Sequence, residues 1–112
     1  MSMEEKRRRG CCEPVPPALP NERAEELAAV FKALGDPTRL QMLYMLVAAD
    51  GAICVCDFTQ AFGVSQPTVS HHLAKLRDAG LVEAEHHGIW TYYTLGPGLP
   101  PEVRALLEGV RA

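Results

Sequence analysis

The chain alternates between helical stripes of apolar residues and short breaks that contain glycine, proline or acidic residues. Apolar positions recur every three or four residues in five stretches, and this spacing is typical of amphipathic helices. The predicted helices cover residues 21–34, 37–49, 54–62 and 66–79, and a short last helix follows Pro101. The pattern therefore predicts a mainly α domain.

Local signals predict where these helices begin and end. Asn21, Asp36 and Ser65 are predicted N-caps, because their side chains can accept hydrogen bonds from the first free backbone N–H groups. Pro37 and Pro67 fall in first turns, where the missing N–H of proline is tolerated. The predicted breaks are Gly35, Asp50–Gly51, Gly63 and Gly80.

Between residues 81 and 95 the apolar period changes from that of a helix to that of a strand. LVEAE and IWTYYTL are β-prone runs joined by His86-His87-Gly88, which predicts a hairpin. A short helix, a glycine-containing turn, a second helix and a hairpin predict a winged helix-turn-helix. We expect a homodimer, since two-fold symmetry would present two reading helices to a palindromic DNA site.

The helix over residues 66–79 has the composition of a DNA-reading element. From Ser65 to Arg77 it contains no acidic residue, although the whole chain carries a formal net charge of −3. This local absence matters because DNA phosphates repel carboxylates. The alternative is an ordinary solvated helix, and His72 lies near the apolar edge, where it could pack instead. The predicted DNA-binding residues are Ser65, Gln66, Thr68, Ser70, His71, His72, Lys75, Arg77 and, on the wing, His87.

Residues 1–20 are polar and then proline-rich, which predicts a flexible N-terminal arm that carries Cys11 and Cys12. Residues 21–112 would form the winged helix-turn-helix domain for DNA binding and dimerisation. No apolar run is long enough to cross a membrane, and the start of the chain lacks the apolar segment of a secretory signal. We expect a cytoplasmic protein, in which four cysteines serve metal or redox chemistry rather than disulfides.

Two thiols stand one residue apart in AICVCDF, at Cys54 and Cys56. Helical residues at this spacing point about 200° apart, so the thiols converge only if Cys54 precedes the helix. A helix N-terminus also lowers thiol pKa and favours thiolates, and Asp57 fits there as a structural acid rather than a ligand. Thiolates select soft ions. The sequence has no C-x-x-C motif and no catalytic Cys–His pattern, so we expect no enzyme.

The segments FKALGDPTRLQML, ICVCDF, VSQPTVSHHLAKLRDAGLV and GIWTYYTL resemble the ArsR/SmtB family of metal-sensing repressors over residues 22–95. The resemblance implies a winged-helix dimer, without an organic cofactor, that leaves its operator and derepresses detoxification or efflux genes when a metal ion binds. SQPTVSHH matches the family's recognition helix, and ICVCD matches its metal-binding box. His86-His87-Gly88 replaces the arginine that many family wings carry, which leaves the wing's phosphate contact open.

The resemblance also bears on the ligand set. The arsenic-sensing pattern CxCxxC has Thr59 at its third position here, and the C-terminal segment EVRALLEGVRA lacks the histidine of the family's other site. The cadmium- and lead-sensing branch joins arm cysteines to this box across the dimer. By that resemblance the expected metal ligands are Cys11, Cys12, Cys54 and Cys56. The effector could be arsenite, antimonite, cadmium or lead, and a metal-independent thiol redox repressor is the alternative.

Overall fold

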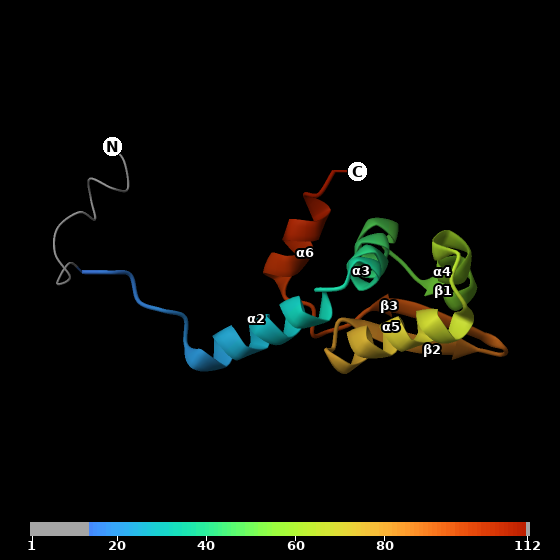
Figure 1. Cartoon of the computed structure of the whole chain (residues 1–112), viewed down its shortest axis with the longest axis horizontal. Coiled ribbons are helices and arrows are strands. Elements are labelled where there is room, and N and C mark those ends of the chain that lie inside the picture. Colours follow the sequence, from blue (N-terminus) through green and yellow to red (C-terminus); the bar gives the residue numbers. More distant parts are fainter. Residues whose placement is uncertain (1–13, 112) are drawn as a thin grey trace.

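The computed structural model describes residues 14–111 and places five helices and three strands among them (Figure 1). The three strands form an antiparallel sheet with the order β1-β3-β2. This arrangement confirms the predicted winged helix-turn-helix. In chain order the elements are α2 (Asn21–Ala33), α3 (Pro37–Ala49), β1 (Ile53–Cys54), α4 (Val55–Phe62), α5 (Gln66–Asp78), β2 (Val82–His87), β3 (Trp90–Leu95) and α6 (Pro101–Glu108).

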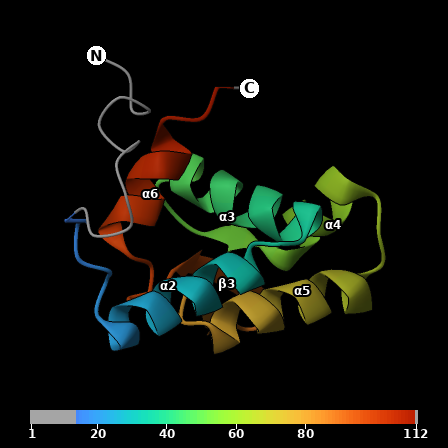
Figure 2. The ribbon, with the colours of Figure 1, turned by 60° about the vertical axis from the view of Figure 1, so that its left-hand side comes forward.

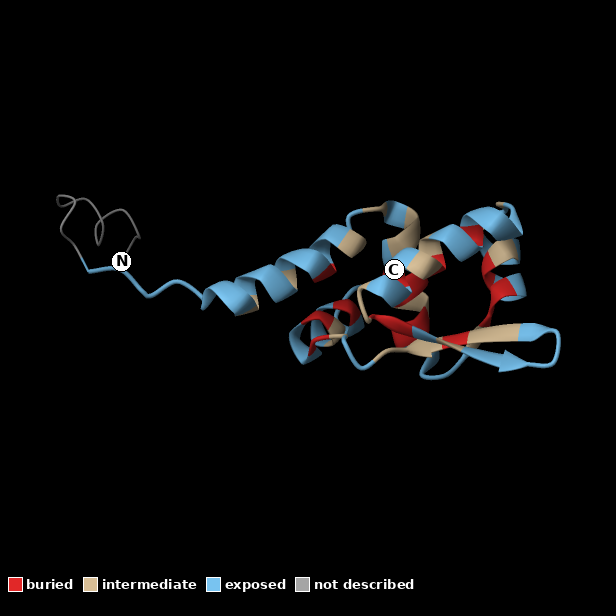
Figure 3. Ribbon diagram, turned by 90° about the horizontal axis from the view of Figure 1, so that it is seen from below, coloured by how far each residue is buried: buried red, intermediate tan, exposed pale blue. Residues whose placement is uncertain are grey.

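The hydrophobic core lies where α3, α4 and α5 meet the sheet, and Figure 3 shows the buried residues gathered there. The predicted apolar stripe of α5, Val69, Leu73 and Leu76, is fully buried. Burying one such side chain stabilises the fold by roughly 1.5–3 kcal/mol. Because this stripe is in the core, the opposite side of α5 must face solvent.

Two of the three predicted N-caps are confirmed. The Asp36 carboxylate accepts a hydrogen bond from the Arg39 backbone N–H at 3.0 Å, and the Ser65 hydroxyl accepts one from the Thr68 backbone N–H at 3.4 Å. The prediction for Asn21 is wrong, since Asn21 is already helical and Pro20 occupies the cap position. Helix formation starts one residue early there because the Pro20 carbonyl accepts from the Ala24 N–H at 3.0 Å.

The wing turns at a different place from the predicted one. His86 and His87 are the last residues of β2, and His87 is paired with Trp90 across the hairpin. The turn is therefore the two residues Gly88–Ile89. Gly88 has a φ of 63°, a left-handed value that glycine adopts without strain, so the tightest possible loop forms at this position.

A third strand joins the predicted hairpin. Ile53 and Cys54 of β1 pair with Tyr93 and Tyr92 of β3. A strand of two residues is too short to produce an alternating pattern, which is why the sequence did not predict it. The consequence is that the first thiol of AICVCDF belongs to the same sheet as the wing.

The N-terminal side of the domain is the helix α2, whose last turns pack into the core through Val30 and Leu34. Figures 1 and 2 both place the beginning of α2 on the side of the molecule away from α4. An ion pair between Arg23 and Glu102 links α2 to α6. Cys11 and Cys12 lie outside the described residues. No helix within residues 14–111 has the length and apolarity that a bilayer crossing requires.

The Asp36 cap generates a prediction about stability. The Arg39 N–H holds the pKa of the Asp36 carboxyl below its usual value, although partial burial opposes this effect. A carboxyl whose pKa is lower in the folded state stabilises above its unfolded pKa and loses this contribution as pH falls through the folded pKa. We expect Asp36→Ala to lower Tm by a few degrees at pH 7, with a smaller difference near pH 3.

Thermal unfolding followed by circular dichroism at both pH values measures this effect. Asp36→Asn is the matched control, because asparagine keeps the cap hydrogen bond but does not titrate. Equal Tm values for the wild type and Asp36→Ala at pH 7 would contradict the role of the cap.

Candidate DNA interface and thiol site

Most of the predicted DNA-binding residues lie on the solvent-facing side of α5. Since the apolar stripe of this helix is in the core, its polar residues form one outer surface. Its first turn has no acidic residue, and its last turn carries Lys75 and Arg77. The predicted DNA-binding residues of α5 that are exposed are Gln66, Thr68, Ser70, His71, Lys75 and Arg77. Asp78, the last residue of the helix, is also exposed.

The beginning of α5 is organised by its cap. The Ser65 and Thr68 hydroxyls lie 3.0 Å apart and form a hydrogen bond with each other, and both residues are exposed. The remaining N–H groups of the first turn point outward from the helix end, as at any helix N-terminus. Backbone N–H groups in this arrangement suit a phosphate oxygen.

His72 differs from the other predicted DNA-binding residues. Its side chain is only 17% exposed, and its Nδ1 lies 3.8 Å from an Asp36 carboxylate oxygen. The ring therefore sits between α5 and the start of α3. This position favours the alternative in which His72 packs within the domain.

The wing carries His87 near its tip, but the surroundings are acidic. The Nε2 of His87 lies 3.4 Å from a Glu85 carboxylate oxygen, and its ring packs edge-on against Tyr92. Glu83 is also exposed on β2. These carboxylates oppose an approach of this strand to phosphates.

The two thiols of AICVCDF converge. Cys54 has an extended backbone (φ −74°, ψ 146°) as the N-cap of α4, and Cys56 follows in the first turn. The Cys56 thiol donates a hydrogen bond to the Cys54 sulfur, with a separation of 2.9 Å between the two sulfur atoms. This confirms the geometric condition stated from the sequence, because Cys54 precedes the helix instead of belonging to it. Cys54 is buried and Cys56 is exposed.

The expectation that the helix N-terminus favours a thiolate is wrong for Cys56. The hydrogen bond to Cys54 raises the pKa of the Cys56 thiol, and partial burial and the electrostatic interactions with Cys54 and Asp57 raise it further. These effects outweigh the favourable backbone N–H of Asp57. The Cys56 thiol therefore loses its proton less readily than an isolated thiol.

The described residues supply no cysteine thiols beyond these two. Within residues 14–111 there is no group of three His, Cys, Asp or Glu side chains placed to hold a metal ion. The Thr59 hydroxyl donates to the Val55 carbonyl at 3.0 Å, so the residue in the third position of CxCxxC is engaged within its own helix. A three-sulfur site would need ligands from elsewhere.

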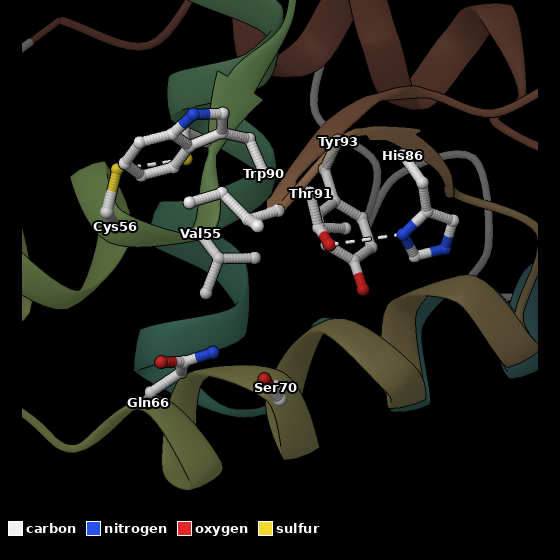
Figure 4. Close-up of a pocket in the computed structure, with 10 residues that line it drawn as sticks. Val55, Cys56, Gln66, Ser70, His86, Trp90, Thr91 and Tyr93 are labelled. Carbon is white, nitrogen blue, oxygen red and sulfur yellow. Dashed lines mark hydrogen bonds between the residues drawn. The ribbon is translucent and has the colours of Figure 1, made fainter.

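A cleft of about 240 Å³ opens beside the thiols (Figure 4). Gln66 and Ser70 of α5 form one wall, and Trp90 and Thr91 of β3 form another. Trp90 is not among the site residues that the sequence predicted. Its position as the only tryptophan, inside a predicted wing strand, was the available signal.

Comparison with known proteins places the chain in a family. The family model described as "Bacterial regulatory protein, arsR family" matches residues 36–84. The arsenic resistance transcriptional regulator ArsR1 of Pseudomonas putida is 48% identical over 81 residues, which are 72% of this chain and 62% of that protein. ArsR2 of the same organism, also an arsenic resistance transcriptional regulator, is 43% identical over 79 residues, covering 70% of this chain and 68% of that protein.

Comparison with solved structures supports the same family assignment. The structure of HlyU from Vibrio cholerae superposes with a TM-score of 0.70 at 31% identity, covering 80% of this chain and 91% of HlyU. A family of regulatory proteins also agrees with the expectation that the chain is not an enzyme. The order of α3, α4, α5 and the wing, and the identity to both ArsR proteins, show that the chain belongs to the arsR family of bacterial regulatory proteins.

Proposed function

We propose that the protein is a metal(loid)-responsive repressor that binds operator DNA as a homodimer and releases it when a thiophilic ion binds a cysteine site. The observation that carries this proposal is the sulfur contact between Cys54 and Cys56, at the start of the helix that precedes α5. Two converging sulfurs suit a soft ion. The released operator would control detoxification or efflux genes.

The DNA-binding part of the proposal rests on charge and exposure. The outer side of α5 combines hydrogen-bonding side chains, which can read base edges, with Lys75 and Arg77, which can neutralise phosphates. In a chain of net negative charge, the part of this surface from Ser65 to Arg77, which contains no acidic residue, is the favourable place for DNA to approach.

The homodimer would cover an apolar surface. Exposed large apolar side chains stand on α2, α3 and α6, and a groove of about 360 Å³ lies between α3 and the end of the chain. A second copy would remove this surface from water, and two α5 helices would then face one DNA site. The exposed large apolar residues of these helices are Phe31, Leu40 and Leu106, and Val110 follows α6.

The sulfurs that complete the site would come from the partner's arm. A trivalent arsenic centre takes three sulfurs, and cadmium or lead takes three or four, so Cys54 and Cys56 alone are too few. In one subunit, residues 14–20 join α2 at its end away from α4 (Figures 1 and 2). Residues 14–20 thus lie on the opposite side of the subunit from its own α4. We infer that Cys11 and Cys12 of one subunit meet Cys54 and Cys56 of the other.

Arsenite is the effector that we favour among the soft ions. The two Pseudomonas relatives are named for arsenic resistance, and their similarity extends over about 70% of this chain. A shift from binding to release requires that the ion weaken DNA affinity, and a coupling of about 3 kcal/mol corresponds to a loss of about 150-fold. Antimonite, cadmium and lead stay alternatives that a titration separates.

The DNA surface gives one prediction. Because each lysine or arginine at a phosphate releases about one counterion, we expect Lys75→Ala and Arg77→Ala to weaken binding of any duplex. Each substitution should lower the slope of log affinity against log salt concentration by about 1. Fluorescence anisotropy over a series of salt concentrations measures both effects. Arg104→Ala, which removes the same charge from α6, should leave the slope unchanged; an equal change there would contradict a local contact.

The thiol pair gives a second prediction. Under excess reductant, arsenite should release operator DNA from the wild type with a loss of affinity of about 150-fold. The double variant Cys54→Ser/Cys56→Ser should bind DNA normally and lose this response, because no convergent sulfurs remain. Electrophoretic mobility shifts with and without arsenite measure it. If peroxide releases the DNA while arsenite and cadmium under reductant do not, the protein is a redox switch.

The arm gives a third prediction, in a mixture of two variants. Cys11→Ser/Cys12→Ser and Cys54→Ser/Cys56→Ser should each fail to respond to arsenite. A heterodimer of the two contains one intact site if the ligands come from different subunits, and none if they come from the same subunit. We therefore expect arsenite to release DNA from the purified heterodimer, with one ion bound per dimer by mass spectrometry. A heterodimer that binds no ion overturns the cross-subunit arrangement.

A further inference from the structure

The cleft beside the thiols is bounded by the thiol pair, by α5 and by the wing. Cys54 and Cys56 stand at one end, the first turns of α5 supply Gln66 and Ser70, and the wing supplies Trp90. Figure 4 shows the Trp90 ring extending from β3 toward the side of Cys56, above the α5 residues. A change at the sulfurs therefore has a short path to both DNA-facing elements within one subunit.

The backbone reinforces this path. Cys54 pairs with Tyr92, which is two residues along the strand from Trp90. The same strand, β3, pairs along its length with β2, the other half of the wing. Backbone hydrogen bonds hold paired strands at a fixed spacing, so a displacement of Cys54 moves β3 with it. The other wall of the cleft belongs to α5, whose place is set by its buried stripe.

Trp90 is the large side chain in the β3 wall of the cleft. Its exposed fraction is 49%, so about half of the indole surface is packed and half faces solvent. An aromatic ring that is half exposed has solvent on one side, into which it can change its rotamer. Because Trp90 is large, half-packed and close to the thiols, its side-chain conformation can respond to a change at Cys54 or Cys56.

We propose that Trp90 is a positioning residue that couples the thiol site to DNA affinity: an ion on Cys54 and Cys56 repacks the indole in the cleft and changes the distance between the wing and α5. The inference rests on the proposed function, because it assumes an ion at these thiols. In addition to the proposed closure of the arm between subunits, it gives the ion a route to the DNA surface within one subunit.

The test separates three quantities in the wild type and in Trp90→Ala: ion affinity, DNA affinity without ion, and DNA affinity with ion. Arsenite binding is measured by competition with a chromophoric dithiol, and DNA binding by anisotropy on a duplex selected by the wild type. We expect Trp90→Ala to keep the first two within about threefold. The release by arsenite should fall from about 150-fold to below about tenfold.

Two further variants test whether the effect depends on the aromatic ring of Trp90. Trp90→Phe keeps an aromatic ring in the cleft and should retain most of the response. Ile89→Ala removes an apolar side chain that also borders the cleft but is 90% exposed, so it should retain most of the response. The wild-type tryptophan emission should change on addition of arsenite, and Cys54→Ser/Cys56→Ser should abolish that change.

These measurements separate a failure of the proposed function from a failure of the coupling role of Trp90. If the wild type binds no ion, or binds it without releasing DNA, the proposed function fails. If the wild type responds and Trp90→Ala responds equally, only the coupling role of Trp90 is overturned. A Trp90→Ala protein that has lost DNA affinity without ion would assign the indole to DNA contact, which also overturns the coupling role.

Discussion

The pairing of Cys54 with Tyr92 is the contact on which the arrangement of the site depends. It holds Cys54 in an extended conformation at the entrance of α4, so that its side chain does not follow the helical rotation. Two cysteines at this spacing inside one helix would point about 200° apart. With one residue in the strand and one in the helix, their sulfurs approach to 2.9 Å. The same strand pair carries the wing, so one set of backbone hydrogen bonds determines both the thiol geometry and the hairpin position.

The DNA-facing side of the domain depends on a different constraint, the burial of the apolar stripe of α5. Val69, Leu73 and Leu76 have no exposed surface, and this fixes the rotation of the helix about its axis. The polar residues of the opposite side are then presented together. The stretch from Ser65 to Arg77 contains no acidic residue on a chain of net charge −3, and this gives DNA one preferred direction of approach. The exposed Glu83 and Glu85 make the wing a weaker contact than α5.

The thiol pair is partly exposed, and by itself it supplies too few ligands for a soft ion. These two properties have a common consequence for regulation. A buried, fully coordinated site would hold its ion without needing other parts of the protein, and its occupancy would have few ways to affect DNA affinity. Here Cys56 is exposed and Thr59 is engaged with the Val55 carbonyl, so in the proposed site a third sulfur would come from outside residues 14–111. An ion that draws together separate segments can change their relative placement, and that is the differential interaction which allostery requires.

The sequence by itself determined the helices, their caps at Asp36 and Ser65, the buried stripe of α5, the hairpin and the four family motifs, because these depend on local periodicity and on side chains acting on their own backbone. It also located both thiols at the start of a helix. Only the tertiary structure decided that Cys54 joins a sheet, that the wing turns at Gly88–Ile89, that His72 faces Asp36 and that Trp90 borders the thiols. It also reversed the expected direction of the Cys56 pKa, because a neighbouring sulfur outweighs the helix end. Each of these features arises from residues that are distant in the chain or from competing contacts on one atom, and a linear pattern contains neither.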